Sequence, residues 1–342
     1  NLTLLHVCGD DPIMVKFLVD AGIPLTVHSK TELTPLHRAC LHGYLAKVKM
    51  LVDLGAKVND DRYTGDEVRS ALHCACDGGH MEVVRYLVEE KDADPFRKDQ
   101  NGKLPIHQAC KMKHKQIVDF LLDACEFFPD TPDSKGNTCL HWVCRKVETA
   151  DKDAVYALAR SLLNRMPSII NIQNLEGQTA LHYASFWSAD LCEMLVEGYD
   201  ADLTKKDRVG QTPLILAARH GEAGGGTVSY LAGIMAERTP GFVNITDNMG
   251  WTALHWTSFR YDERLIRVLV EAGADANIPS VCGRRPLHLV GRFDFPTGLY
   301  QRDSHLDGAL DRTIVFKSRT VVNDSAKALL EGGANSIAGD HR

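Results

Sequence analysis

The sequence lacks any run of 18 or more apolar residues, so it encodes no helix that could span a membrane. It also lacks an excess of positive charge. The 39 Lys and Arg residues face 45 Asp and Glu residues, and the net charge of −6 argues against binding to nucleic acid through general electrostatics. Ten Cys in 342 residues are too few for a disulfide-stapled secreted domain. We therefore expect reduced thiols and a cytoplasmic location, with the nucleus as the alternative.

Recognisable catalytic and metal-binding motifs are also missing. Zinc sites usually pair cysteines two to four residues apart, and neither Cys74 with Cys76 nor Cys139 with Cys144 completes such a set. The glycine-rich segment 221–227 lacks the Lys that a phosphate-binding loop needs, and it follows a predicted helix rather than a strand. A nucleophile elbow, the kinase motifs and His-Glu-x-x-His are absent as well. The sequence therefore predicts no enzyme activity, no cofactor and no metal in this segment.

What the sequence does contain is one short motif that recurs nine times. Its typical form is Thr or Ser, then Pro or Ala, then Leu, then His, as in Thr34-Pro-Leu-His37 and Thr252-Ala-Leu-His255. Successive copies are 31 to 41 residues apart, and in several an apolar pair such as Leu51-Val52 lies 14 and 15 residues after the His. We number the repeats one to nine by the last residue of the motif, which is His6, His37, His73, His107, His141, His182, Ile215, His255 and His288.

Each repeat predicts two helices and a turn. The Thr or Ser hydroxyl can cap a helix start, and Pro at the next position suits the first helical turn. After about two helical turns comes a stretch with Gly and His, such as Gly78-Gly79-His80, and then a second amphipathic helix that carries the apolar pair. Segments of the form Asp-x-x-Gly, including Asp99–Gly102 and Asp247–Gly250, predict tight turns in which Gly adopts a positive φ.

These features resemble the ankyrin repeat family. The likeness rests on Thr34-Pro-Leu-His37, on Gly79-His80 with Val83-Val84 and on Val270-Glu-Ala-Gly-Ala-Asp275, and it covers nearly the whole chain. It implies an all-α solenoid of paired antiparallel helices with β-turn fingers, and a concave groove that usually binds another protein. The motif His then bonds its capping hydroxyl and the backbone between repeats. Four cysteines are read as small buried residues rather than metal ligands: Cys40, Cys76, Cys110 and Cys144.

The repeats also predict the layout of the chain. Residues 1–291 hold repeats one to eight and the inner helix of repeat nine, and residues 325–342 hold the outer helix of repeat nine. The insertion 292–324 contains Arg312–Val322, two β-prone runs about a polar centre, which predict a small hairpin. Because long loops often carry function, this insertion is a candidate second binding element or intramolecular latch. The first repeat starts without a preceding finger, so we expect the segment to belong to a longer protein.

The resemblance to ankyrin repeats implies which residues line the groove. They are those four and five positions after the motif residue, together with the finger tips. From repeat four onward this set is basic and aromatic, and Trp and Arg are over-represented at binding hot spots. We therefore predict that a protein or peptide with acidic and apolar groups binds the following groove residues: Lys111, Met112, Arg145, Lys146, Phe186, Trp187, Arg219, His220, Trp251, Phe259 and Arg260.

Two questions stay open at the level of the sequence. Trp142 and Trp256 directly follow the motif His, so we expect them in the core, whereas Phe186, Trp187 and Phe259 fit either the core or the groove. The function is open between two classes. One is a non-catalytic module, such as a scaffold, that binds a protein partner. The other is the regulatory ankyrin region of a larger enzyme, ion channel or pathogen effector whose activity lies outside these residues.

Overall fold

The computed structural model describes residues 3–26, 33–59, 69–125, 130–146, 151–221, 226–290 and 319–333, and these residues form helices and turns but no strands. Contacts within the chain divide it into two units, Asn1–Leu175 and Glu176–Arg342. No helix in the described ranges has both the length and the apolar composition that crossing a bilayer requires.

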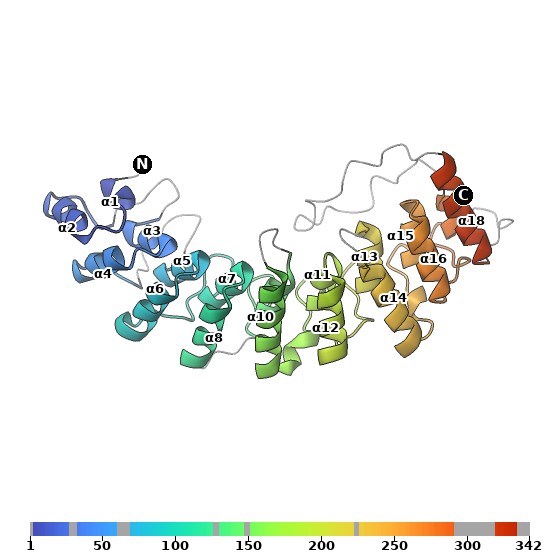
Figure 1. Ribbon diagram of the computed structural model, residues 1–342, viewed down its shortest axis with the longest axis horizontal. Helices are drawn as coiled ribbons and strands as arrows, with labels where there is room; N and C mark the ends of the chain where they lie inside the picture. The colour runs from blue at the N-terminus through green and yellow to red at the C-terminus, as the bar shows by residue number, and fades with distance from the viewer. Residues whose placement is uncertain are drawn as a thin grey trace. The chain divides into compact units, whose positions relative to one another are not determined.

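The first unit is a stack of helix pairs that follow one another in chain order (Figure 1). Each inner helix packs against the next inner helix and against its own outer partner, and neighbouring outer helices also pack together. The inner helices are α1 Leu4–Val7, α3 Pro35–His42, α5 Ala71–Gly78, α7 Pro105–Met112 and α9 Cys139–Cys144. The outer elements are α2 Pro12–Asp20, α4 Leu45–Asp53, α6 Met81–Arg85 with the π-helix η1 Tyr86–Glu90, α8 Lys115–Ala124, and α10 Lys152–Arg165 with the 3-10 helix η2 Pro167–Asn171.

The second unit repeats this arrangement, with an inner row and an outer row of helices (Figure 1). Its inner helices are α11 Ala180–Ser185, α13 Pro213–His220, α15 Ala253–Phe259 and α17 Pro286–Leu289. Its outer elements are α12 Ala189–Tyr199, α14 Thr227–Arg238 with the 3-10 helix η3 Phe242–Asn244, α16 Glu263–Glu271 and α18 Arg319–Glu331. The predicted all-α architecture of stacked helix pairs is confirmed.

Where the motif ends in His, it builds a similar hydrogen-bond network at the start of the inner helix. In repeat eight, Oγ1 of Thr252 accepts the backbone N–H of His255 at 3.4 Å, and the Thr252 N–H donates to Nδ1 of His255 at 3.1 Å. The other ring nitrogen, Nε2, bonds the carbonyl of Arg284 in the next repeat at 3.1 Å. Burial lowers the pKa of His255 to about 4, so the ring is neutral at pH 7 and can accept at Nδ1 while donating at Nε2. The motif histidines are therefore structural, as expected.

The Asp-x-x-Gly segments form the predicted turns. Oδ1 of Asp133 accepts the backbone N–H of Lys135 at 2.8 Å and that of Asn137 at 2.9 Å. Gly136 has a φ of 78°, which residues with a Cβ rarely adopt. A Cβ at Gly136 would also lie 2.8 Å from the backbone nitrogen of Leu175 in the next finger. Glycine is required here both by the turn and by the close approach of the next finger.

Helix α18 differs from the sequence prediction at its start. The sequence predicts a hairpin over Arg312–Val322 and an outer helix from residue 325, but α18 begins at Arg319. Residues 320–322 are helical, so that part of the hairpin prediction is wrong. The helix-forming residues that follow, such as Ala326, Ala328 and Leu329, outweigh the β-propensity of Thr-Val-Val. The remainder of the predicted insertion, through residue 318, lies outside the described residues.

Candidate functional site

The predicted groove residues lie at the ends of the inner helices. They occupy the last turn of α7, α9, α11, α13 and α15 or the residues just after it, except Trp251, which lies in the finger before α15. Most of their side chains are half-buried, and three are exposed: Met112, Lys146 and Arg260. The set is therefore anchored by the fold and still reachable from solvent, as a binding surface requires.

The second unit gathers several of these residues into one aromatic and cationic cluster. The ring centroid of Trp251 lies 4.7 Å from that of Trp256 and 5.9 Å from that of Phe259. The guanidinium carbon of Arg219 lies 5.5 Å from the Trp256 centroid, and Nη1 of Arg260 donates to the Arg219 carbonyl at 3.3 Å. We call these five residues the Trp251 cluster. Its two cations border an aromatic patch, an arrangement suited to a ligand with acidic and apolar groups.

His220 and Phe186 form a second contact in the same unit. Their rings meet edge to face with centroids 4.8 Å apart. Burial, followed by the nearby charges of Arg219 and Arg260, lowers the pKa of His220 to about 4, so the ring is neutral at pH 7. Its buried Nε2 has no hydrogen-bond partner among the described residues. Trp187, the neighbour of Phe186 at the end of α11, is half-buried.

The first unit gathers cations around a different tryptophan. Trp142 in α9 is 6% exposed, and its Nε1 donates to Oδ2 of Asp133 at 3.1 Å. Nζ of Lys103 lies 4.1 Å from the Trp142 ring centroid, and the guanidinium carbon of Arg145 lies 5.5 Å from it. The sequence pattern indicated Arg145 but not Lys103, because only the fold brings the finger of repeat four beside α9. The charge of Lys111 in α7 also acts on Lys103, and we call Lys103, Lys111, Trp142 and Arg145 the Trp142 cluster.

Both tryptophans that follow a motif His lie in the core, as expected. Trp256 is 5% exposed and repeats the contact of Trp142, since its Nε1 donates to Oδ2 of Asp247 in its own finger at 3.2 Å. In each case the indole connects an inner helix to the preceding turn. Trp142 and Trp256 are therefore buried rings against which the neighbouring cations lie.

The cysteines of the inner helices are packed residues. Cys40, Cys76, Cys110 and Cys144 are all fully buried. Burial raises the pKa of Cys144 to about 12, partly offset by the charge of Lys113, so the thiol stays protonated. Within the described ranges, no group of three or more His, Cys, Asp or Glu side chains is placed to hold a metal ion.

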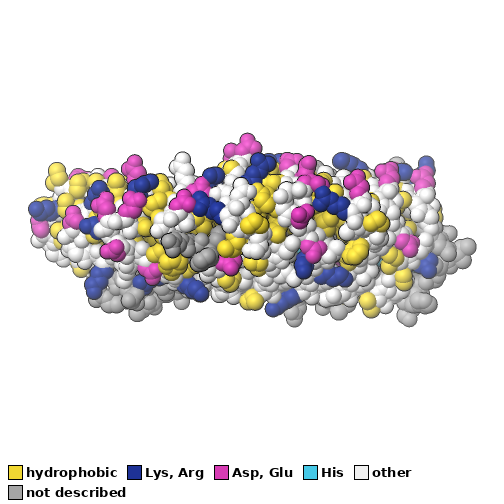
Figure 2. All heavy atoms as spheres, turned by 90° about the horizontal axis from the view of Figure 1, so that it is seen from below, with side chains coloured by type: hydrophobic (Ala, Val, Ile, Leu, Met, Phe, Trp, Pro, Cys, Tyr) yellow, Lys and Arg dark blue, Asp and Glu magenta, His cyan; other side chains and the backbone are white. Residues whose placement is uncertain are grey.

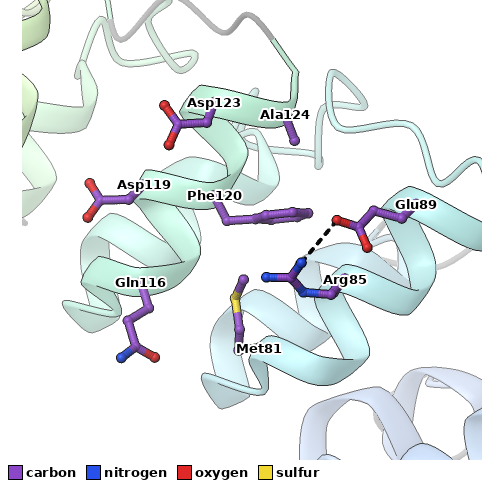
Figure 3. Close-up of a pocket in the computed structure, with 8 residues that line it drawn as sticks. All are labelled: Met81, Arg85, Glu89, Gln116, Asp119, Phe120, Asp123 and Ala124. Atoms are coloured by element: carbon purple, nitrogen blue, oxygen red, sulfur yellow. Dashed lines mark hydrogen bonds and ion pairs between the residues drawn. The ribbon is translucent and has the colours of Figure 1, made fainter.

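A pocket of about 660 Å³ lies between outer elements of the first unit (Figure 3). Arg85 of α6 pairs with Glu89 of η1 at 3.3 Å, and its guanidinium carbon lies 5.2 Å from the ring centroid of Phe120 in α8. The remaining lining residues are Met81, Gln116, Asp119, Asp123 and Ala124. No predicted groove residue lines this pocket, and Arg85, its one basic lining residue, is already paired within the protein.

Charges of both signs are mixed on the face that Figure 2 presents. Lys and Arg side chains lie among Asp and Glu, with apolar side chains between them. A site for a nucleic-acid backbone needs a continuous basic surface. The face in Figure 2 shows no such surface.

Comparison with known families agrees with this architecture. The model described as ankyrin repeats in three copies matches residues 60–131, 125–207 and 187–280, and the single ankyrin repeat model matches residues 31–60. These matches extend over well more than half of the chain, which therefore belongs to the ankyrin repeat family. Ankyrin repeats are protein-interaction modules, and this is the class of protein that the fold defines.

Individual relatives match only parts of the chain. Inversin of Canis lupus familiaris is 29% identical over 140 residues, which are 41% of this chain and 12% of inversin. Protein phosphatase 1 regulatory subunit 27 of Mus musculus is 33% identical over 97 residues, which are 28% of this chain and 60% of that protein. Among solved structures, the human ASB11 ankyrin repeat domain aligns with a TM-score of 0.54 at 24% identity, covering 67% of this chain and 96% of that one. This last likeness supports the fold alone.

Proposed function

We propose that the chain is a non-catalytic module that binds a partner protein or peptide through the predicted groove residues. The observation that carries this proposal is the Trp251 cluster. It combines half-buried aromatic rings with Arg219, which is fixed by a stacked indole, and with the exposed Arg260. Tryptophan, tyrosine and arginine dominate binding hot spots because they bury large areas and still make directed polar contacts.

The chemistry of the cluster favours a partner that presents acidic and apolar groups together. Arg219 and Arg260 offer planar guanidinium groups that can hold a carboxylate through two N–H bonds. Trp251 and Phe259 offer ring surface next to these groups. Trp256 already orders the side chain of Arg219 in the free protein. Binding therefore loses less side-chain entropy than it would on a flexible surface.

A second class of function is suggested by how small a part of each relative aligns with this chain. The aligned regions are only 12% of inversin and 60% of the phosphatase regulatory subunit, so those relatives carry long segments beyond the matched repeats. The alternative proposal is therefore that this region regulates an activity located elsewhere in a larger protein. In both cases the repeats act by binding, and a cytoplasmic scaffold is the simplest form of this role.

The test compares two variants of the tagged chain expressed in cells. Trp187→Ala combined with Arg219→Ala removes two groove side chains, whereas Glu237→Ala changes an exposed residue of the outer helix α14. Far-UV circular dichroism checks that both variants fold. We expect the double variant to lose most of the proteins that co-purify with the wild-type chain, and Glu237→Ala to retain them. Equal recovery with both folded variants would contradict the proposal.

A further inference from the structure

In the part of the chain that the structure describes, no carboxylate forms an ion pair with the cations of the Trp142 cluster in the first unit. Among the described residues, Lys103, Lys111 and Arg145 make no ion pair, in contrast to Arg69 nearby, which pairs with Asp77 at 3.4 Å. Burial lowers the pKa of Lys103, and the positive charge of Lys111 is the next largest cause. Like charges are thus held close enough to repel one another.

The two acids whose charges act on Lys103 are already engaged in the finger turns. Asp99 and Asp133 both act on Lys103 from a distance and partly oppose the effect of Lys111. Oδ1 of Asp99 accepts the backbone N–H groups of Asn101 and Lys103, each at 2.8 Å. Both oxygens of Asp133 are within 3.3 Å of Nδ2 of Asn137, and Oδ2 also accepts from Trp142. Neither carboxylate makes a hydrogen bond with an ammonium or guanidinium group of the cluster.

The fold also holds the backbone and the side chain of Arg145 in place. Lys113 follows α7 at a φ of 66°, and its buried Nζ donates to the carbonyls of Trp142 at 2.5 Å and Arg145 at 3.1 Å. These bonds cap the C-terminal end of α9, where partial negative charge collects. Arg145 is therefore anchored through its backbone by Lys113 and through its side chain by Trp142, before any ligand arrives.

We propose that the Trp142 cluster binds a phosphorylated side chain of a partner protein, a role that rests on the proposed protein-binding function. A phosphomonoester carries about −1.5 to −2 charges and three acceptor oxygens at pH 7. Lys103, Lys111 and Arg145 together supply three positive charges with N–H donors for those oxygens. A single carboxylate carries one charge and two oxygens, so it satisfies the cluster less completely. The exposed Lys146 follows Arg145 and adds a fourth cation at the rim.

The experiment uses three immobilised peptide libraries with mixed flanking residues and one fixed central residue: phosphoserine, serine or glutamate. We expect the wild-type chain to be retained by the phosphoserine library and not by the other two. Lys103→Gln combined with Arg145→Gln should weaken retention by about tenfold or more, because two charge-assisted contacts are lost. Lys57→Gln changes an exposed Lys outside the cluster in the same unit and should bind as the wild type does.

A further variant separates loss of binding from loss of folding. Lys103 and Arg145 contact Trp142, whereas the half-buried Lys111 has no hydrogen-bond partner in the described chain, so Lys111→Gln should fold normally and still weaken retention. Three results would each overturn the proposal. The glutamate library could retain the chain equally well, the folded variants could be retained as the wild type is, or the chain could bind vesicles with phosphoinositide lipids and not the phosphopeptides. A partner that is lost with Trp187→Ala and Arg219→Ala but survives phosphatase treatment would overturn this inference alone and leave the proposed function standing.

Discussion

Lys113 gives the sharpest prediction about stability, because its ammonium is buried at the end of a helix. It stands at the C-cap of α7, where α3 and α5 end in Gly43 and Gly79, and it is 7% exposed. Desolvation lowers its pKa from 10.5 to about 8. At about 1.4 kcal/mol for each pKa unit, the difference corresponds to roughly 3 kcal/mol between the two protonation states.

Proton linkage gives the direction in which the stability changes with pH. Above pH 8 the folded protein releases the Lys113 proton, while the unfolded chain keeps it until about pH 10.5. The unfolded state binds more protons in this window, so this residue makes the folded state more stable as pH rises. The neutral amine still has two N–H groups for the carbonyls of Trp142 and Arg145, so deprotonation keeps the cap.

The assay is denaturant unfolding followed by circular dichroism at several values between pH 7 and 10.5. Lys113→Met keeps most of the side-chain volume and has no proton to release. We expect the unfolding free energy of the wild type, minus that of Lys113→Met, to rise by about 3 kcal/mol across the window. Titrations of other groups cancel in this difference. Lys57→Met, at an exposed position, should follow the wild type. Parallel pH profiles for the wild type and Lys113→Met would refute the reasoning.

Three further predictions concern the stability of particular residues and of the first helices. Trp256→Phe removes the Nε1 bond to Asp247 and should lower the unfolding free energy by about 1–3 kcal/mol in denaturant titrations. Lys47 is fully buried, and no nitrogen or oxygen atom of the described residues forms a hydrogen bond with its Nζ. Lys47→Met should therefore raise the unfolding free energy by about 1–3 kcal/mol, and a loss would contradict this. Amide hydrogens of α1 and α2 should exchange faster than those of α7 and α8, because Ile13 is 80% and Phe17 66% exposed; equal protection by mass spectrometry would count against it.

The parts of the fold that depend on local pattern were predictable from the sequence. The capping Thr or Ser, the motif His and the Asp-x-x-Gly turn each act within a few residues of one another, and the repetition fixes their environment. This is why the roles of Thr252 and His255, and the core position of Trp256, could be inferred without coordinates. Repeat four shows the limit of the pattern, since Leu104 lacks the hydroxyl but its N–H still bonds Nδ1 of His107 at 3.0 Å.

The parts that depend on contacts between repeats were not predictable in the same way. Lys103 joins Arg145 on Trp142 only when the finger of repeat four lies beside α9. The unusual role of Lys113 did leave a signal in the sequence, because Lys113 stands where repeats two, three and seven have Gly43, Gly79 and Gly221. The start of α18 was mispredicted because the helix-forming residues after Thr-Val-Val outweigh the preference of that short run for a strand.

Site-specific photo-crosslinking tests the central claim, that the groove residues contact the partner, most directly. A photoreactive amino acid is placed at position 260, in the exposed rim of the Trp251 cluster, or at position 237, exposed on the outer helix α14 of the same unit. Crosslinked proteins are then identified after irradiation in cells. The account predicts that position 260 captures one or a few proteins that position 237 does not, and that Arg219→Ala removes this capture. Capture from position 237 alone, or capture at position 260 that Arg219→Ala leaves unchanged, would contradict it.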